Sequence, residues 1–131
     1  MHFTQIKETC LYVSDLDACE AFYHGKLEMP VISKVPGRHI FFKTGSSVLL
    51  CFIPEVTAQE EALPPHFAKG PQHIAFECEA DRYQEWKSLL EEKDIPMIHE
   101  QAWPGGYHSA YFLDPDGHVL EIVPKGMWEE G

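Results

Sequence analysis

The feature that most constrains the fold is an internal repeat with a period of about 65 residues. Each half of the 131-residue chain predicts the same order of elements, namely one strand, one helix and then three strands. The segment IKETCLYV opens the first half, and QHIAFEC opens the second. Because a repeated supersecondary unit is expected to fold in the same way each time, the sequence predicts two similar βαβββ modules.

In the first half, runs of β-branched and aromatic residues alternate with turn residues. Ser14 and Asp15 are candidate N-caps for an amphipathic helix over residues 16–23, and Gly25 is its expected stop. The strands predicted in this half are Ile6–Val13, Val31–Val35, His39–Lys43 and Val48–Ile53.

The second half repeats this pattern. Asp81 is a candidate cap for a helix that continues through Leu90. The run DPDG at residues 114–117 predicts a tight turn, because Pro suits the second position of a type I turn and Gly accepts positive φ. The strands predicted in this half are Gln72–Cys78, Ile95–His99, Ser109–Leu113 and Val119–Val123.

The chain has the size of one ordinary domain, so we predict a single α+β domain over residues 1–131. The expected parts are module 1 at about 4–54, a linker at about 55–70 and module 2 at about 71–124. The acidic, Pro-rich linker is long enough for part of it to be helical or to fold over a site. The modules are expected to form a curved eight-stranded mixed sheet around a metal cleft, and they can pair within one chain or across a dimer.

The composition excludes several classes of function. A formal net charge of −11 would repel nucleic acid and anionic membranes, whereas it suits a cationic ligand. No stretch approaches the ~20 apolar residues of a membrane span, and the first residues show no signal-peptide pattern. The cysteines have no CxxC spacing, so we expect free thiols and a cytoplasmic protein.

Four positions stand out when the two halves are aligned. Glu8 aligns with His73 in the first strand, and Cys51 aligns with Glu121 when LCFIP is placed on LEIVP. Taken singly, a histidine in a strand is more often structural, and Glu8 can face solvent. Glu121, however, lies in the apolar run VLEIV, where a carboxylate is costly to bury unless it is paired or binds a metal.

We therefore predict that Glu8, His73 and Glu121 hold one divalent metal ion per site. Carboxylate and imidazole ligands accept zinc, nickel, iron, manganese or cobalt, so the metal is left open. Three protein ligands leave coordination positions for water or substrate, which is typical of a catalytic site. The thiol of Cys51 is a further soft ligand or a wall of the cleft, although burial as a small hydrophobe is its more common role.

Three segments of the chain resemble the vicinal oxygen chelate superfamily, which includes glyoxalase I, bleomycin-resistance proteins, extradiol dioxygenases and fosfomycin-resistance transferases. These segments are IKETCLYVSDLDACEAFY, GPQHIAFEC and SAYFLDPDGHVLEIVP. The resemblance implies paired βαβββ modules, a metal cleft, a small-molecule substrate and a homodimer. It also implies ligand roles for His73 and Glu121. The first ligand of the family is commonly His or Gln, and here that position holds Glu8.

The subfamilies differ in residues that can be compared. Bacterial glyoxalase I resembles this chain except that it has Arg where Tyr12 stands and a fourth ligand Glu where Cys51 stands. Extradiol dioxygenases carry a tyrosine ten residues before the ligand Glu, as Tyr111 does here, but bind iron through two His and one carboxylate. Bleomycin-resistance proteins are also acidic, but they bind their ligand without using the metal ligands. The three predicted ligands would therefore have no role in a protein of this type.

Fosfomycin transferases share a Ser-Phe-Tyr-Phe run that Ser109 and Tyr111 match. Their cationic positions fall on Gln101 and Glu130, which lack the positive charge needed to hold a phosphonate.

The loop WPGGYH before the seventh strand offers further candidates. Trp103 and Tyr107 can line the substrate cleft, and the two glycines between them would let the loop cover the substrate. His108 or Tyr111 is a candidate for donating a proton to a substrate oxygen, and Glu8 or Glu121 for moving a proton. The ordinary role for each is that of a surface or packing residue.

The predicted metal site, together with the resemblance to this superfamily, implies a metal-dependent enzyme of glyoxalase or dioxygenase type. Its substrate would be a small oxygen-rich molecule, either free or conjugated to a thiol. It would bind the metal through adjacent oxygens. The alternative is a ligand-binding or sequestering protein of bleomycin-resistance type, which would bind a cationic or aromatic compound without metal or turnover. A third case is a domain whose metal is adventitious.

Overall fold

The computed structural model describes residues 1–129 and divides into two compact units. Unit 1 is Met1–Gly70, and unit 2 begins at Pro71. In unit 1 the elements are β1 (Glu8–Tyr12), α1 (Leu16–Glu20), η1 (Ala21–Lys26), β2 (Val31–Val35), β3 (His39–Thr44), β4 (Ser47–Phe52) and α2 (Pro54–Thr57). In unit 2 they are β5 (His73–Cys78), η2 (Ala80–Arg82), α3 (Tyr83–Glu92), β6 (Met97–Ala102), η3 (Pro104–Gly106), β7 (His108–Leu113) and β8 (Val119–Pro124).

Both units have the same sheet topology. The strand orders are β1-β4-β3-β2 and β5-β8-β7-β6, and each sheet is mixed because its first pair is parallel and the other pairs are antiparallel. The predicted α+β class and the repeated βαβββ order are confirmed. The eight strands of the described residues form two four-stranded sheets rather than one continuous sheet.

The helix of unit 1 begins as its sequence predicts and ends differently. Oδ1 of Asp15 accepts hydrogen bonds from the backbone N–H groups of Asp17 and Ala18, at 2.8 and 3.1 Å, which is the N-cap arrangement. The predicted stop at Gly25 is wrong, because the helix widens into the π-helical turn η1 and continues through this residue. The chain leaves the helix at Glu28, which takes the positive φ of 62°.

One face of the unit 1 sheet packs against α1 and η1 to form a core. Because side chains alternate between the two faces of a sheet, every second residue of each strand points to this face. Its fully buried side chains include Leu11, Ile40, Phe42, Leu49 and Cys51 from the sheet, with Cys19 and Tyr23 from the helical segment.

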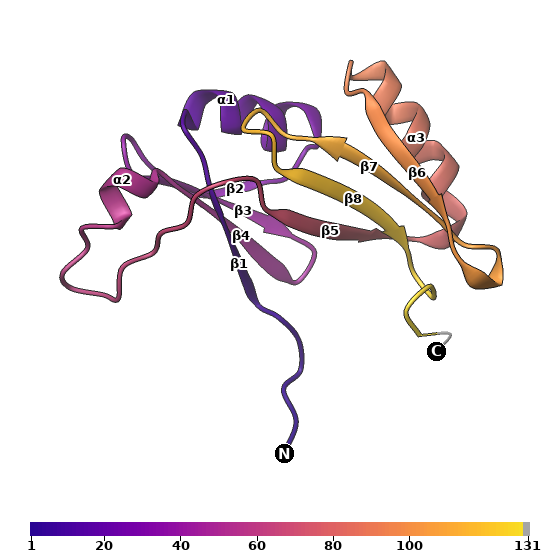
Figure 1. The fold of residues 1–131 in the computed structure, drawn as a ribbon, viewed down its shortest axis with the longest axis horizontal. Coiled ribbons are helices and arrows are strands. Elements are labelled where there is room, and N and C mark those ends of the chain that lie inside the picture. Colours follow the sequence, from indigo (N-terminus) through magenta and orange to yellow (C-terminus); the bar gives the residue numbers. More distant parts are fainter. Residues whose placement is uncertain (130–131) are drawn as a thin grey trace. The chain divides into compact units, whose positions relative to one another are not determined.

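The core of unit 2 is built in the same way. Figure 1 shows α3 running along one side of the sheet made by β5 to β8. The buried side chains on this side include Ala110, Phe112, Leu120 and Ile122 from the sheet, with Tyr83, Leu90 and Ile95 from α3 and the segment after it. The opposite face of the sheet is therefore left for other roles.

The predicted turn between β7 and β8 is confirmed. The Gly117 N–H donates to the Asp114 carbonyl at 3.0 Å, and Gly117 has φ +81°. Oδ1 of the buried Asp114 accepts from the N–H groups of Asp116 and His118, both at 2.9 Å. These bonds fix the length of the connection and hence the register of β8 against β7.

The segment after β4 is partly helical. It opens with the one-turn helix α2, where Pro54 supplies the first residue. The buried Thr57 hydroxyl donates to the His66 carbonyl at 2.6 Å, and the His66 N–H donates to the Thr57 carbonyl at 3.2 Å. The residues between them therefore form a closed loop.

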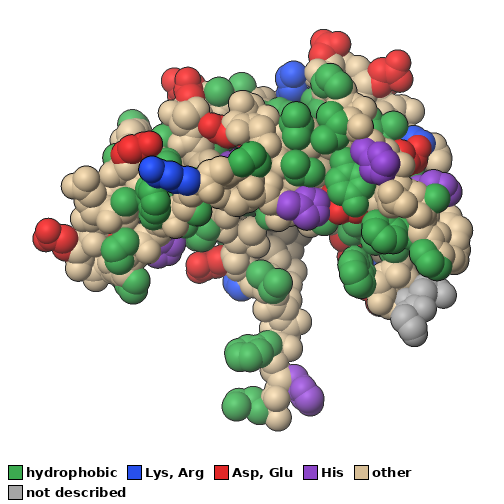
Figure 2. Space-filling view, in the orientation of Figure 1, with side chains coloured by type: hydrophobic (Ala, Val, Ile, Leu, Met, Phe, Trp, Pro, Cys, Tyr) green, Lys and Arg blue, Asp and Glu red, His purple; other side chains and the backbone are tan. Residues whose placement is uncertain are grey.

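None of the helices described by the structure has the length and apolar character needed to cross a membrane. The acidic side chains on the face drawn in Figure 2 lie apart from one another rather than in a single patch.

Candidate functional site

Glu8 and His73 occupy equivalent positions in the two units. Glu8 opens β1 and lies beside Val48, and His73 opens β5 and lies beside Val119. The N–H groups of these two valines donate to the carbonyls of the residues just before Glu8 and His73, both at 2.8 Å. The repeat-based alignment of Glu8 with His73 is therefore confirmed by hydrogen-bond register.

The predicted alignment of the last strands is wrong by one residue. In unit 2, Glu121 lies two residues after the strand partner of His73. In unit 1, the residue two positions after the strand partner of Glu8 is Leu50. Leu50 is thus the equivalent of Glu121. Cys51 faces the helix side and is 0% exposed in the core of unit 1, so the structure does not bring it to the face that carries Glu8.

His73 and Glu121 meet on the face of the unit 2 sheet opposite α3. Nε2 of His73 lies 3.1 Å from Oε1 of Glu121, and Nδ1 of the same ring lies 2.7 Å from the Val119 carbonyl oxygen. The His73 side chain is about half exposed, whereas the Glu121 side chain is 8% exposed. His73 is thus accessible to solvent, whereas Glu121 is buried.

The hydrogen bonds of His73 decide which nitrogen carries its proton. A carbonyl oxygen only accepts, so Nδ1–H donates to Val119 and the neutral ring has a lone pair on Nε2. That lone pair faces the Glu121 carboxylate oxygen, which is also an acceptor. A cation between the two atoms would satisfy both, and an Nδ1–H to carbonyl bond is typical of metal-binding histidines. The donor set therefore fits a divalent metal.

Of the three predicted ligands, the structure brings two together within unit 2. Glu8 belongs to unit 1, where it is exposed at the start of β1. Among residues 1–129, no group of three or more His, Cys, Asp or Glu side chains is arranged to hold a metal ion. Glu130, which the fosfomycin comparison involves, lies outside the described residues.

Tyr111 lies directly beside Glu121 across the β7–β8 pair. Both side chains lie on the sheet face that carries His73. Burial raises the pKa of Tyr111, the Ser109 hydroxyl opposes this, and the Glu121 carboxylate raises the pKa further. Tyr111 therefore keeps its proton at neutral pH.

Trp103 is connected to the same group of residues. Its indole Nε1–H donates to Oγ of Ser109 at 2.9 Å, and Ser109 is 0% exposed. Tyr107 lies differently, with its ring against Gly105 and its hydroxyl against Gly126. Trp103 therefore contacts the sheet face that carries Tyr111.

His108 lies on the other side of the sheet from Tyr111. It pairs with Ala102, so its side chain lies on the same sheet face as that of Glu100. Its charge contributes to the lowered pKa of Glu100. Glu100 in turn bonds Tyr83 of η2–α3, so this side of the sheet faces the helix. The two residues predicted as alternative proton donors, His108 and Tyr111, thus lie on opposite faces of the sheet.

His99 is a residue of this face that the sequence pattern did not indicate. Its ring centroid lies 5.6 Å from that of Tyr111, and the His73 centroid lies 6.0 Å from Tyr111 on the other side. Nε2 of His99 lies 2.9 Å from Oε1 of Gln101, so this nitrogen donates. The signal that could have found it is strand parity, because His99 pairs with Tyr111 across the β6–β7 ladder.

The face of unit 1 that carries Glu8 has an aromatic cluster at its far end. Phe52 is flanked by the rings of His39 and His66, at centroid distances of 6.1 and 5.2 Å, and the Arg38 guanidinium lies 5.8 Å from its centroid. Arg38 also bonds Nδ1 of His39 and pairs with Glu60 at 3.3 Å. Burial and then the Arg38 charge lower the pKa of His39. These contacts attach the closed loop after α2 to the sheet.

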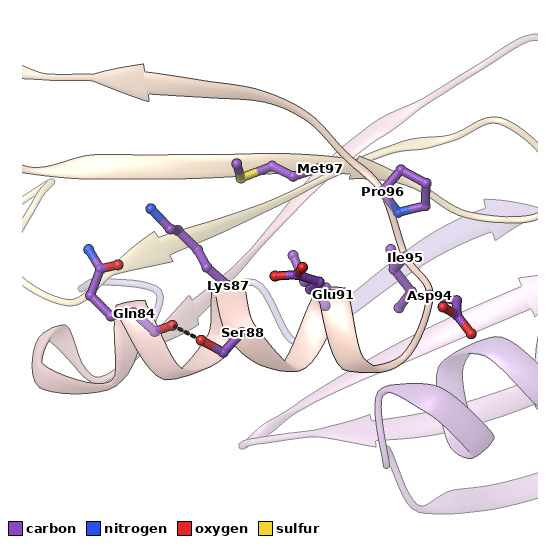
Figure 3. A pocket seen from close by; sticks show the side chains of 9 residues that line it. Gln84, Lys87, Ser88, Glu91, Asp94, Ile95, Pro96 and Met97 are labelled. Carbon is purple, nitrogen blue, oxygen red and sulfur yellow. Dashed lines mark hydrogen bonds between the residues drawn. The ribbon is translucent and has the colours of Figure 1, made fainter.

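A groove of about 570 Å³ lies elsewhere on unit 2, between α3 and the segment leading into β6. Figure 3 shows its polar wall on the helix, including Gln84, Lys87 and Glu91, and the chain from Asp94 to Met97 on the other side. None of its lining residues is a predicted ligand or proton donor. The groove is thus separate from the His73–Glu121 pair.

Known proteins resemble this chain over nearly its whole length. A structure of lactoylglutathione lyase from Agrobacterium tumefaciens is 37% identical, with a TM-score of 0.91 and coverage of 97% of this chain and 98% of that one. Metallothiol transferase FosB from Staphylococcus epidermidis is 27% identical over 124 residues, which are 93% of this chain and 82% of that protein.

A mutant of the fosfomycin resistance protein FosX from Listeria monocytogenes, complexed with Mn(II) and a dihydroxypropylphosphonic acid, shares the fold. Its identity is 20% and its TM-score 0.69, over 93% of this chain and 90% of that one. Residues 5–122 also match the Glyoxalase/Bleomycin resistance protein/Dioxygenase superfamily. This chain therefore belongs to the glyoxalase/bleomycin resistance protein/dioxygenase superfamily.

Proposed function

We propose that the protein is a metal-dependent enzyme of glyoxalase type. Its substrate would be a small oxygen-rich molecule, either free or conjugated to a thiol. The observation that carries this proposal is the His73–Glu121 pair, in which Nε2 of His73 lies 3.1 Å from Oε1 of Glu121 while Nδ1 bonds the Val119 carbonyl. When the imidazole is neutral, Nε2 and the carboxylate oxygen are both acceptors, and a cation between them satisfies both. The names of the relatives agree, since one is a metallothiol transferase, one a lactoylglutathione lyase and one an Mn(II) complex.

His73 and Glu121 would hold the metal, with Glu8 as the proposed third ligand because of its equivalent position in unit 1. A divalent ion bound there would supply Lewis-acid polarisation of adjacent substrate oxygens. Zinc, nickel, iron, manganese and cobalt all remain candidates for a set of one imidazole and two carboxylates.

The neighbouring residues hold this pair in place. The Val119 carbonyl fixes the ring orientation of His73 through Nδ1–H, and Tyr111 lies beside Glu121 across the β7–β8 pair. Such outer contacts orient metal ligands and increase their basicity. Tyr111 is the proposed proton donor to a substrate oxygen, and Glu8 is the proposed residue for moving a proton to or from the substrate.

The first test is calorimetric titration of Mn²⁺ and Zn²⁺ into metal-free protein. We expect His73→Ala and Glu121→Gln each to weaken binding by at least tenfold, and Glu8→Gln to weaken it as well. Glu77→Gln is the matched control, because Glu77 is an exposed carboxylate on the same strand as His73. Affinities equal to that of the unsubstituted chain in both His73→Ala and Glu121→Gln would refute the metal site.

The second test is turnover by the metal-loaded protein. Thiol adducts of methylglyoxal and catechols represent the two leading substrate types. Turnover that disappears in both His73→Ala and Glu121→Gln, and persists in Glu77→Gln, would support the proposal. Turnover that survives in both ligand variants would place the chemistry elsewhere.

A sequestering protein is the second candidate, favoured by the formal net charge of −11. It predicts tight binding of a cationic aromatic compound to metal-free protein, with affinity unchanged in Glu121→Gln and no turnover of the bound compound. Light scattering on the same samples would test the homodimer that the family resemblance implies.

A further inference from the structure

We infer that Arg38 binds the carboxylate group of a ligand with an aromatic body, and that the Glu60 carboxylate competes with this ligand for the same guanidinium group. The inference deepens the proposed function and rests on it for the role of the ligand as substrate, because it assigns a charge and a shape to the oxygen-rich molecule. Arg38, Glu60 and the rings around them all belong to unit 1.

The backbone of Arg38 is fixed on both sides. Its N–H donates to the Val35 carbonyl at 3.0 Å, and its carbonyl accepts from the Ile53 N–H at 2.8 Å. The first bond closes the turn between β2 and β3, and the second ties this turn to the end of β4. A binding group built on such a scaffold needs little reordering when a ligand arrives.

Three contacts hold the guanidinium group at the Phe52 ring. Its carbon lies 5.8 Å from the Phe52 centroid, Nη1 bonds Nδ1 of His39, and Nη2 lies 3.3 Å from Oε2 of Glu60. A guanidinium only donates, so Nδ1 of His39 is the acceptor and the imidazole is neutral. Burial and then the Arg38 charge lower the pKa of His39, in agreement with a neutral ring. Glu60 is therefore the group of this cluster that balances the positive charge of Arg38.

The Arg38–Glu60 ion pair is of a kind that a ligand can replace. One oxygen and one nitrogen meet at 3.3 Å, which is longer than the about 2.7–2.9 Å typical of a charge-assisted bond. The side chains are 29% and 23% exposed, so small solutes can reach them. A carboxylate can instead bond a guanidinium through two parallel N–H···O bonds, which is the stronger arrangement. A ligand carboxylate bound in this way would displace that of Glu60.

Glu60 can leave Arg38 while its loop stays closed. The loop is closed by the Thr57 hydroxyl, which donates to the His66 carbonyl at 2.6 Å, and by the backbone bond between the same residues at 3.2 Å. The His66 ring lies against Phe52, at a centroid distance of 5.2 Å. Because none of these contacts uses the Glu60 side chain, rotation about its side-chain bonds is sufficient to free the guanidinium.

The rings next to Phe52 favour an aromatic body for the ligand. Tyr12 and Phe41 are partly exposed, and their ring centroids lie 6.2 and 5.5 Å from that of Phe52. Aromatic rings favour offset-stacked or edge-to-face contacts with other rings. These side chains therefore suit a planar ring, and Arg38 suits the negative charge attached to it.

The strand register relates Arg38 to Glu8. Tyr12 pairs with Phe52, and Glu8 lies four residues before Tyr12 on the same face of the sheet. A strand rises about 3.3 Å per residue, so Tyr12 lies about 13 Å along β1 from Glu8. A ligand held by Arg38 at the Phe52 end can extend along this face toward Glu8, the proposed third metal ligand.

The first test is NMR titration of benzoate into metal-free, ¹⁵N-labelled protein. Benzamide is the uncharged analogue with the same ring, and acetate is a carboxylate without a ring. We expect benzoate to bind most tightly of the three and to shift the backbone amide signals of Arg38, His39 and Ile53. Equal affinity for benzoate and either analogue, or shifts confined to unit 2, would overturn the inference.

The second test repeats the titration in two variants. Arg38→Lys keeps the charge but removes the two-bond geometry, and it should weaken benzoate binding by roughly tenfold. Glu60→Gln removes the competing charge and should tighten benzoate binding by roughly fivefold. An ion pair that only attaches the loop to the sheet predicts unchanged or weaker binding in Glu60→Gln, and that result would overturn the inference. Because the expected effect of Glu60→Gln is a gain, a folding defect cannot produce it.

Arg82→Lys and Glu85→Gln are the matched controls. Their parent residues form an exposed ion pair of similar length, 3.4 Å, in unit 2. Both variants should bind benzoate with the affinity of the unsubstituted chain. A loss in Arg82→Lys equal to that in Arg38→Lys would mean that benzoate binds surface arginines in general, and the inference would be refuted.

This inference and the proposed metal site fail in different ways. If Arg38→Lys weakens benzoate binding and Glu60→Gln tightens it, while His73→Ala and Glu121→Gln leave Mn²⁺ affinity unchanged, the carboxylate site stands and the proposed function is refuted. If His73→Ala and Glu121→Gln weaken Mn²⁺ binding, while benzoate affinity is the same in Arg38→Lys and Glu60→Gln as in the unsubstituted chain, the metal site stands and this inference is refuted.

Discussion

Nε2 of His73 lies 3.1 Å from Oε1 of Glu121, on the sheet face opposite α3. The pair consists of two acceptors when the imidazole is neutral, because Nδ1–H is used by the Val119 carbonyl. A bound cation should therefore stabilise the folded state, since an unfolded chain does not hold these two groups together.

Chelation should lower the thermal stability of the metal-loaded protein. With free metal at about 100 times Kd, binding contributes about 2.7 kcal/mol, which corresponds to a Tm higher by roughly 5–15 °C in a chain of this size. Differential scanning calorimetry with and without EDTA measures the difference. The difference in Tm should almost disappear in Glu121→Gln and should be unchanged in Glu77→Gln. A chelator effect of equal size in Glu121→Gln would mean that the metal binds elsewhere.

Cys51 should affect stability and leave metal binding unchanged. Its side chain is fully buried among the residues that face α1, so Cys51→Ala removes packing and should cost about 1 kcal/mol. Urea unfolding measures this loss, and calorimetric titration with Cd²⁺, which prefers thiolate ligands, tests ligation. A lower Cd²⁺ affinity in Cys51→Ala would contradict the register that places Leu50, and not Cys51, opposite Glu121 in the repeat.

Glu100 should make unfolding dependent on pH in the acid range. Its pKa is lowered by the hydrogen bond from Lys87, at 2.9 Å, and then by that from Tyr83, at 2.8 Å. A carboxyl whose pKa is lower in the folded state stabilises that state above the unfolded pKa of about 4.3. This contribution is lost as the pH falls through the lower folded pKa.

Glu100→Gln should therefore destabilise the protein by about 1 kcal/mol at pH 7 and by less at pH 3. Urea unfolding at the two pH values checks this. Glu85→Gln is the control, because its ion pair with Arg82 is exposed on both sides and should contribute little at either pH. A difference between Glu100→Gln and the unsubstituted chain that grows on acidification would reverse the assigned sign.

The DPDG turn should depend on a side-chain acceptor. Asp114→Ala leaves the N–H groups of Asp116 and His118 without Oδ1, and the loss should be about 1–3 kcal/mol. Asp114→Asn keeps an oxygen in the same place and should retain most of the stability. Thermal unfolding of the two variants compares them, and equal losses would show that charge, rather than acceptance of these bonds, is what the turn requires.

Much of the fold can be predicted from the sequence because each strand carries local signals. The strand Val31–Val35 is predicted with its observed bounds, and the DPDG turn and the Asp15 cap follow from side-chain chemistry that acts over a few residues. The end of the first helix cannot be predicted in this way. Gly25 is a common stop, yet the π-helical bonds of η1 carry the helix past it.

The candidate site is predictable only in part. His73 and Glu121 stand out because each is a polar residue in an apolar strand context. Leu50 and Cys51 lie in one apolar run, so hydrophobicity does not indicate which of them is the equivalent of Glu121, and only the β1–β4 register decides. The contact of Trp103 with Ser109 depends on how a glycine turn folds back, which residue spacing does not reveal.

The most direct measurement of the central claim is elemental analysis of protein purified without an affinity tag and without added metal. The account predicts about one equivalent of a divalent transition metal in the unsubstituted chain and in Glu77→Gln, and a loss of most of it in His73→Ala and in Glu121→Gln. Full metal content in both ligand variants, or no metal in the unsubstituted protein even after incubation with Mn²⁺, Zn²⁺, Ni²⁺, Fe²⁺ or Co²⁺, would contradict it.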